Sequence, residues 1–189
     1  MVKKIFLAFT LMSCFFFHAN AQDLFAKGDK VVSVGVGIGS YLGGSGYKMS
    51  VPPILATYDQ CIIDGLIKGK ASIGVGGYLA YTANKWETTI SGYDYGYKYS
   101  YMIIGARGTF HYQAMDKLDT YGGAMLGYDI VNSRYFGDDA YSAASKASGS
   151  ELAYSLFVGA RYYFMDNLAA FAEVGYGIAA LELGISYKF

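Results

Sequence analysis

Residues 31–39 read VVSVGVGIG, and this stretch decides the fold. Branched apolar side chains stand at every second position from Val32 to Ile38, and serine or glycine fills the positions between them. Successive side chains of a β-strand point to opposite faces, so this alternation predicts a strand with one apolar face and one face of small residues. The same period of two recurs through the rest of the chain.

Eight segments carry the alternation, and we predict a strand for each. They cover residues 31–41, 54–59, 70–83, 95–112, 123–130, 152–162, 170–177 and 181–189. The second strand is expected to begin after Pro52-Pro53, because proline is tolerated where a strand starts. Short and long connections alternate between the strands. The short ones lie near residues 64–65, 116–117 and 166–167, the long ones span 43–50, 84–94 and 132–150, and a tight hairpin is expected at 179–180.

The apolar faces decide which side of the sheet meets solvent. An eight-stranded barrel has room inside for only a modest filling of side chains, and the apolar faces together are too large to fit there. We therefore predict an all-β, eight-stranded antiparallel up-and-down transmembrane β-barrel, with apolar side chains facing lipid and small residues with ion pairs inside. Short turns at one end and long loops at the other agree with this orientation.

The N-terminal residues are typical of an export signal. Lys3 and Lys4 precede an apolar run over 5–17, and Ala19-Asn20-Ala21 forms a cleavage site. We predict a cleaved signal peptide at 1–21 and a barrel domain at 22–189. A lipoprotein signal ending at Cys14 is a weaker alternative, because cleavage there would use only part of the apolar run.

Composition excludes several classes of function. Without the two signal lysines the chain has 13 basic and 15 acidic residues, a net charge of −2, which implies no nucleic-acid partner. The mature chain keeps one cysteine, Cys61, and one histidine, His111, too few for a thiol-based metal site. We expect no metal and no cofactor.

Two C-terminal segments carry a family resemblance. Residues 171–177 read FAEVGYG, and residues 183–189 read LGISYKF, with apolar residues at every second position before an aromatic end. Together with the signal, they resemble the small outer-membrane β-barrels of Gram-negative bacteria, similar to OmpX and the membrane half of OmpA. The resemblance implies a bacterial outer-membrane location and contact with outer-membrane lipid and lipopolysaccharide. It also implies that the outer-membrane assembly machinery recognises the last strand through Ile185, Tyr187 and Phe189.

Four charged residues fall on the inward face of the predicted strands: Arg107, Asp129, Arg161 and Glu173. Buried charges persist when they are paired, and Arg161 is expected diagonal to Glu173 across the 165–167 turn. We interpret the four as an interior charge network that plugs the barrel. The alternative function is a narrow pore for small solutes or ions.

The long loops offer a candidate binding surface. Tyr93, Tyr95, Tyr97, Tyr99 and Tyr101 recur at period two and share one face of a strand. They predict either a stacking surface for a host glycan or phage ligand, or cross-strand packing that stiffens a hairpin. The adjacent acids Asp138 and Asp139 in the longest loop could hold a divalent cation or simply be solvated.

Catalysis is not expected. Small barrels that modify lipids use a nucleophile, a base and an acid near the outer leaflet, whereas His111 falls at the opposite end. The sequence therefore predicts a structural or surface-binding protein that acts through its extracellular loops. A secreted soluble barrel that binds an apolar ligand is a further alternative, which requires its apolar residues in a central core.

Overall fold

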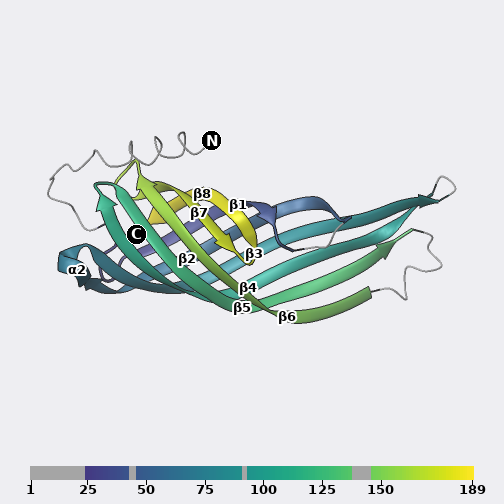
Figure 1. The fold of residues 1–189 in the computed structure, drawn as a ribbon, viewed down its shortest axis with the longest axis horizontal. Coiled ribbons are helices and arrows are strands. Elements are labelled where there is room, and N and C mark those ends of the chain that lie inside the picture. The colour runs from purple at the N-terminus through teal and green to yellow at the C-terminus, as the bar shows by residue number, and fades with distance from the viewer. Residues whose placement is uncertain (1–23, 43–45, 91–92, 138–145) are drawn as a thin grey trace, which may run out of the picture.

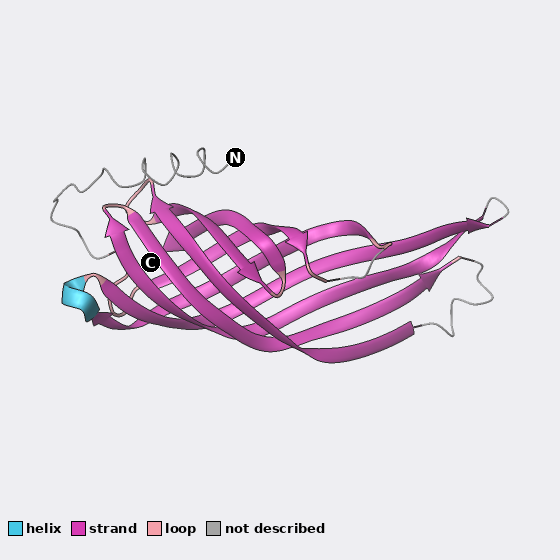
Figure 2. Cartoon of the chain, viewed as in Figure 1, coloured by secondary structure: helices cyan, strands magenta, loops and turns pink. Residues whose placement is uncertain are grey.

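The computed structural model describes residues 24–42, 46–90, 93–137 and 146–189. Eight antiparallel strands close into a barrel in chain order, and β1 pairs with β8 to complete the ring (Figure 1). The strands are β1 (Lys30–Ser40), β2 (Lys48–Gly65), β3 (Ala71–Ile90), β4 (Tyr93–Met115), β5 (Leu118–Phe136), β6 (Lys146–Tyr163), β7 (Leu168–Tyr176) and β8 (Ala179–Lys188). The described chain is strand almost throughout, apart from the single turn α2 (Leu66–Gly69) (Figure 2). The predicted fold class is confirmed.

The two ends of the barrel differ in shape. At one end, which we call the turn end, lie α2, the C-terminus and the tight connections β4–β5 and β6–β7 (Figure 1). At the other, the long-strand end, β3 to β6 continue well beyond the short β7–β8 hairpin (Figure 1). Pairing of β6 with β7 ends at Leu156 and Tyr176, while pairing of β5 with β6 continues to Arg134 and Lys146. A protruding sheet therefore rises from one side of the barrel.

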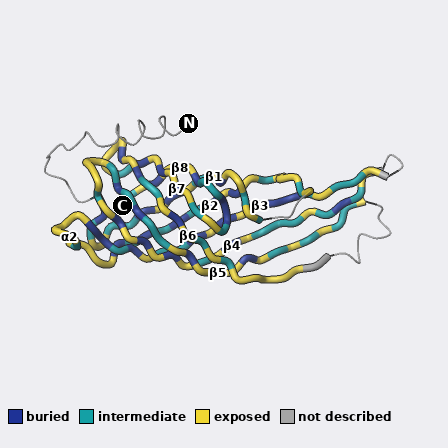
Figure 3. The backbone as a smooth tube through the Cα atoms, viewed as in Figure 1, coloured by how far each residue is buried: buried dark blue, intermediate teal, exposed yellow. Residues whose placement is uncertain are grey.

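Within the barrel, burial alternates along much of each strand, as Figure 3 shows. The apolar side chains predicted to face outward do so: the residues of this set that are at least half exposed include Val34, Ile38, Ile54, Ile104, Leu126, Tyr128, Leu152, Leu156, Val158 and Val174. Their small or charged neighbours point into the barrel. No helix in the described part of the chain is long and apolar enough to cross a bilayer.

The interior holds larger side chains than expected. Besides charged groups, it contains a cluster that includes Leu55, Tyr121, Phe157 and Phe171. Glycine makes room for these rings: a Cβ atom at Gly35 would lie 2.8 Å from the ring of Phe171. The prediction that small residues and ion pairs alone fill the axis is therefore incomplete.

Four predicted boundaries are corrected. Pro52 and Pro53 lie inside β2, at a register shift between Val51 and Ile54 that accommodates two residues without an N–H donor. The described residues of the expected loops at 84–94 and 132–150 are almost all strand, because polar residues continue the ladders beyond the apolar belt. The last connection is Gly177-Ile178, two residues before the predicted hairpin, and Gly177 supplies a φ of 128°.

Candidate functional site

Asp59 stands at the centre of the buried charges. Its side chain, on β2, contacts two arginines that reach it from β4 and β6. Nε of Arg107 lies 3.2 Å from Oδ1 of Asp59, and Nη2 of Arg161 donates to Oδ2. All three side chains are at most 1% exposed. One carboxylate thus binds two guanidinium groups across the barrel, which holds three nonadjacent strands together.

The network continues from each arginine to a second acid. Arg107 donates through Nη2 to Oε2 of Glu173 at 3.0 Å, and Nη1 of Arg161 lies 3.7 Å from Oδ2 of Asp119. Aromatic rings cover the guanidinium planes: Arg107 lies 4.2 Å from the ring centre of Phe157. Such pairing and stacking compensates the cost of removing both cations from water.

A second branch joins His111 to Asp119 near the turn end. Nδ1 of His111 lies 2.9 Å from Asp119, and Nε2 lies 2.9 Å from the Thr109 hydroxyl. Hydroxyl, imidazole and carboxylate follow the order of a nucleophile, base and acid. All three residues are at most 3% exposed, and the ring of Phe25 lies 4.2 Å from the imidazole. The three side chains are therefore almost wholly covered by the described part of the chain.

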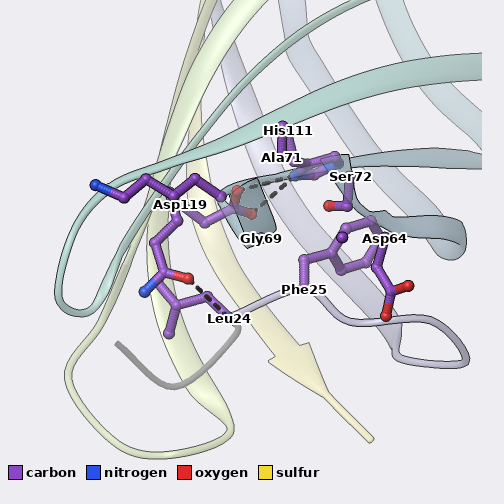
Figure 4. A pocket seen from close by; sticks show the side chains of 11 residues that line it. Leu24, Phe25, Asp64, Gly69, Ala71, Ser72, His111 and Asp119 are labelled. Atoms are coloured by element: carbon purple, nitrogen blue, oxygen red, sulfur yellow. Dashed lines mark hydrogen bonds and ion pairs between the residues drawn. The ribbon is translucent and has the colours of Figure 1, made fainter. Parts of the chain in front are cut away.

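A small cavity beside this branch is shown in Figure 4. It measures about 20 Å³ and is lined by His111, Asp119, Ser72 and the N-terminal residues Leu24 and Phe25, among others. A space of that size holds about one water molecule. Among the described residues, no group of three or more His, Cys, Asp or Glu side chains could hold a metal ion.

The predicted interior residues are only partly brought together. Arg107 contacts Glu173, but Arg161 contacts Asp59 and Asp119 instead of Glu173. The diagonal register expected for Arg161 and Glu173 is confirmed, since Arg161 lies opposite Phe171. Its ion pairs are nevertheless made with Asp119, directly opposite on β5, and with Asp59 across the barrel. Asp129 makes no ion pair with this network: it pairs in register with Ile103, four residues along β4 from Arg107 toward the long-strand end.

Sequence reasoning missed three acids of the interior. Asp59 and Glu182 fall on the inward face by alternation, yet nothing in the pattern indicates their height in the barrel. Asp119 follows the turn near 116–117 and lies before residue 123, where the predicted fifth strand begins, although in the structure it belongs to β5. Glu182 accepts a hydrogen bond of 2.7 Å from the hydroxyl of Tyr78, on the strand across the barrel.

The tyrosines of β4 lie on the inward side of the protruding sheet. Tyr97 and Tyr99 have ring centres 6.2 Å apart, and Tyr97 contacts Tyr135 of β5 at 5.4 Å. Tyr47, which precedes β2, meets Tyr99 edge-on at 5.4 Å. Tyr95 is half-buried in the same row. The rings pack on one another along this face. The side chain of Tyr93, with Asp138 and Asp139, lies outside the described residues.

Basic residues cross the opposite face of the same sheet. Strand register places Lys48 opposite Lys85, Lys85 opposite Lys98, and Lys98 opposite Arg134. We call these four residues the basic row; the next position on β6 is Lys146. Residues directly opposite one another share a face, so four cations line up over β2 to β5.

One acid partly neutralises the basic row. Glu87 contacts Lys85 and lies 3.4 Å from Lys48. Hydrogen bonding to Lys85 lowers the pKa of Glu87 below its usual value. No carboxylate of the described residues pairs with Lys98 or Arg134, both of which are exposed. Within the described residues, the row therefore carries more positive charge than its one acidic partner neutralises.

The last strand closes the barrel. The amide of Phe189 donates to the carbonyl of Lys30 at 2.9 Å, and the amide of Lys30 donates back at 3.2 Å. Ile185, Tyr187 and Phe189 project outward, each more than two fifths exposed. The alternating aromatic end predicted from the sequence thus lies on the outer surface at the β1–β8 seam.

Comparison with solved structures identifies the fold. The attachment invasion locus protein Ail of Yersinia pestis, in complex with the heparin analogue sucrose octasulfate, is 15% identical, with a TM-score of 0.56 over 87% of this chain and all of Ail. The outer membrane protein OprG of Pseudomonas aeruginosa is 12% identical, with a TM-score of 0.57 over 87% of this chain and 97% of OprG. No known family profile and no curated protein sequence matches the chain.

These similarities confirm the resemblance predicted from the sequence at the level of the fold. The chain has the architecture of the small eight-stranded outer-membrane β-barrels. Identities this low show the fold alone, so the function must be argued from the side chains of this chain.

Proposed function

We propose that the protein is an integral barrel of the bacterial outer membrane, exported with a cleaved signal over residues 1–21. The exposed apolar belt supports this, because apolar side chains are stable in contact with lipid acyl chains, whereas their exposure to water costs free energy. The turn end then faces the periplasm and the protruding sheet faces outward, as short turns and long outer strands favour. A soluble barrel would need most of its valines and leucines inside, whereas most of them face outward here and the interior holds arginines and acids beside a smaller aromatic cluster.

The interior is proposed to be a plug rather than a channel. Arg107 and Arg161 cross the axis with their acids, and the rings of Tyr121 and Phe157 fill the space beside them. Planar-bilayer recording on refolded protein tests this. Wild-type protein should give no resolved unitary steps; steps that disappear in Arg107→Ala or Arg161→Ala would instead support the narrow pore.

We also propose that the protein is not an enzyme. Thr109, His111 and Asp119 have the order of a catalytic triad but are buried beneath Phe25. The same three residues satisfy one another as hydrogen-bond partners, which is a structural role. Hydrolysis of a neutral ester that is abolished in His111→Gln would overturn this proposal.

The barrel is proposed to anchor a surface that binds phosphate- or sulfate-bearing glycans. The observation that carries this is the basic row, four cations in register with one acidic partner among the residues that the structure describes. Cations repel one another when they lie side by side, and polyanions bind such a row by replacing that repulsion with attraction. The tyrosine face is a second candidate surface, for a glycan or phage protein that stacks on the rings. The acids Asp138 and Asp139, outside the described residues, stay a sequence prediction for the same binding role.

Sucrose octasulfate, the ligand in the Ail structure, is a suitable probe. We expect the protein in lipid nanodiscs to bind it with an affinity that falls steeply with salt, and Lys98→Glu with Arg134→Glu to weaken binding at least about tenfold. Lys68→Glu with Lys70→Glu makes the same charge change at the turn end and should have little effect. Equal losses in both double variants would contradict a specific surface.

The source of the anionic groups can be separated in the same system. Nanodiscs that contain lipopolysaccharide in one leaflet should compete with sucrose octasulfate if lipopolysaccharide phosphates occupy the row. Unchanged affinity would favour a ligand from outside the cell. Binding depends on the basic row in either case, so the double variant of Lys98 and Arg134 is the control for both the lipopolysaccharide and the external-ligand experiments.

The last strand is proposed to carry the signal for the assembly machinery. Ile185, Tyr187 and Phe189 are outward-facing and accessible at the seam where the barrel closes. Deletion of Phe189 should lower the amount of folded protein in the membranes of cells, while purified protein still refolds in detergent. Normal membrane levels of the truncated chain would remove this part of the proposal.

A further inference from the structure

A pocket lies where β6 extends beyond the end of its shorter neighbour β7. It measures about 170 Å³ at the foot of the protruding sheet. Ile103 and Asp129 line it from the inward face, and Tyr154 and Tyr176 from the outward face. The β6–β7 ladder ends at Leu156 and Tyr176, so no strand closes the wall beside Glu151 to Ser155 in the described chain. The pocket therefore spans the thickness of the wall.

Two carboxylates face each other in this pocket. Asp129 and Glu151 are directly opposite in the β5–β6 ladder. Asp129 is only 5% exposed, and its Oδ1 atom has no hydrogen-bond partner. No lysine or arginine of the described residues pairs with either acid. Like charges at opposed positions destabilise a sheet, and a buried carboxylate without a partner is costly. A cation bound between the two acids would remove both costs.

The remaining walls are apolar and aromatic. The rings of Tyr41 and Tyr176 have centres 5.0 Å apart, and those of Tyr154 and Tyr176 are 6.2 Å apart. Leu42, Ile103 and Ile178 complete the lining on the inner side. Tyrosine faces attract cations, and the aliphatic wall favours an apolar group beside the charge.

This lining suits an organic cation better than a metal ion. Calcium takes six to eight oxygen ligands, whereas two carboxylates are the only acidic groups lining the pocket. A cavity of roughly 150 Å³ accommodates benzene, so the available space fits an aromatic ring that carries a short aminoalkyl group.

We propose that this pocket binds a small organic ammonium ion. The ammonium group is held between Asp129 and Glu151, and its apolar arm lies against Tyr154 and Tyr176. The site is distinct from the basic row, which has the opposite charge and lies on the other face of the sheet. A negative result for the pocket would therefore leave the proposed glycan-binding surface untouched, and the reverse also holds.

Benzylammonium is the probe of choice, with benzyl alcohol as its neutral analogue of similar shape. We expect benzylammonium to bind refolded protein in nanodiscs saturably, with a dissociation constant of about 1 mM for so small a ligand. Amide chemical shifts of β5, β6 and the Gly177-Ile178 turn should follow the titration. Benzyl alcohol should produce no saturable shifts at the same residues.

Substitution of the acids tests the assignment. Asp129→Asn should weaken binding about tenfold, and Asp129→Asn with Glu151→Gln should abolish it. Both variants should fold, because each relieves repulsion between the opposed carboxylates. Asp116→Asn with Asp166→Asn removes the same charge at the turn end and should bind like the wild type.

Three results would overturn the proposal. The first is unchanged benzylammonium affinity in the variant that lacks both pocket acids. The second is equal binding of benzyl alcohol, which would show that charge is irrelevant. The third is calcium or magnesium binding that depends on both acids and displaces benzylammonium at lower concentration, which would make this a metal site.

Discussion

The two ends of this barrel treat charge in opposite ways. Toward the turn end, Arg107 and Arg161 are buried and each contacts two acids. Toward the long-strand end, Asp129 and Glu151 face each other without a described cation, and Lys98 and Arg134 lack a described anion. Compensated charges join strands and contribute to stability. Uncompensated charges reduce the stability of the empty protein, and a ligand of opposite charge removes that cost.

The largest effect is expected where compensation is most complete. Asp59→Asn leaves two buried guanidinium groups without their shared carboxylate, and we expect a loss of about 3–5 kcal/mol in the free energy of unfolding. Denaturant titration in detergent micelles measures it. Asp166→Asn, in an exposed turn, is the control. A loss no larger than that of the control would show that the network does not hold the strands together.

The outer surface should give a somewhat smaller effect. Leu156→Arg, on a side chain that is 62% exposed, should cost about 2–4 kcal/mol if it lies near the middle of the bilayer. Leu156→Met changes shape without charge and should cost far less. Gly74→Ser is a poor control, because a Cβ atom there would lie 2.6 Å from the Thr109 hydroxyl oxygen that contacts His111. Equal tolerance of arginine and methionine at residue 156 would argue against lipid contact.

The smallest effect is expected at the edge of the basic row. Glu87→Gln removes the one acid that contacts Lys85 and Lys48, so sucrose octasulfate should bind more tightly, by less than about tenfold. The free energy of unfolding should hardly change, because both side chains are about one third exposed and solvent screens the pair. Asp94→Asn, near the tip of β4, removes an equal charge farther along the sheet. Weaker binding in Glu87→Gln would mean that the acid orients the row instead of opposing it.

Alternation alone predicts much of the fold. The period of two in segments such as 31–39 assigns each side chain to a face, and the structure confirms those faces. Chain order and turn lengths then give an up-and-down barrel, because neighbouring strands joined by short turns pair with each other. The extra length of β3 to β6 is visible only as a continued polar alternation, which is harder to separate from loop sequence.

The partners inside the barrel could not be predicted in the same way. A face assignment says that Asp59, Arg107 and Arg161 point inward, but their heights depend on the tilt and stagger of strands that are not neighbours. The stagger brings Asp59 of β2 to the same height as Arg107 of β4 and Arg161 of β6, so that it contacts both. Asp129 lies opposite Ile103, four residues along β4 from Arg107, which is a separation of about 13 Å. The pocket at Asp129 also needs the mismatch in length between β6 and β7, which no local pattern encodes.

The most direct test of this account compares two neighbouring residues on opposite faces of β6. In a Trp86→Phe background, which removes the only tryptophan, Leu156→Trp and Phe157→Trp each place one indole in the wall. The protein is reconstituted in lipids with brominated acyl chains, which quench only tryptophan that touches them. We predict strong quenching for Leu156→Trp and little for Phe157→Trp. Equal or reversed quenching would contradict a barrel whose apolar face meets lipid and whose charges lie inside.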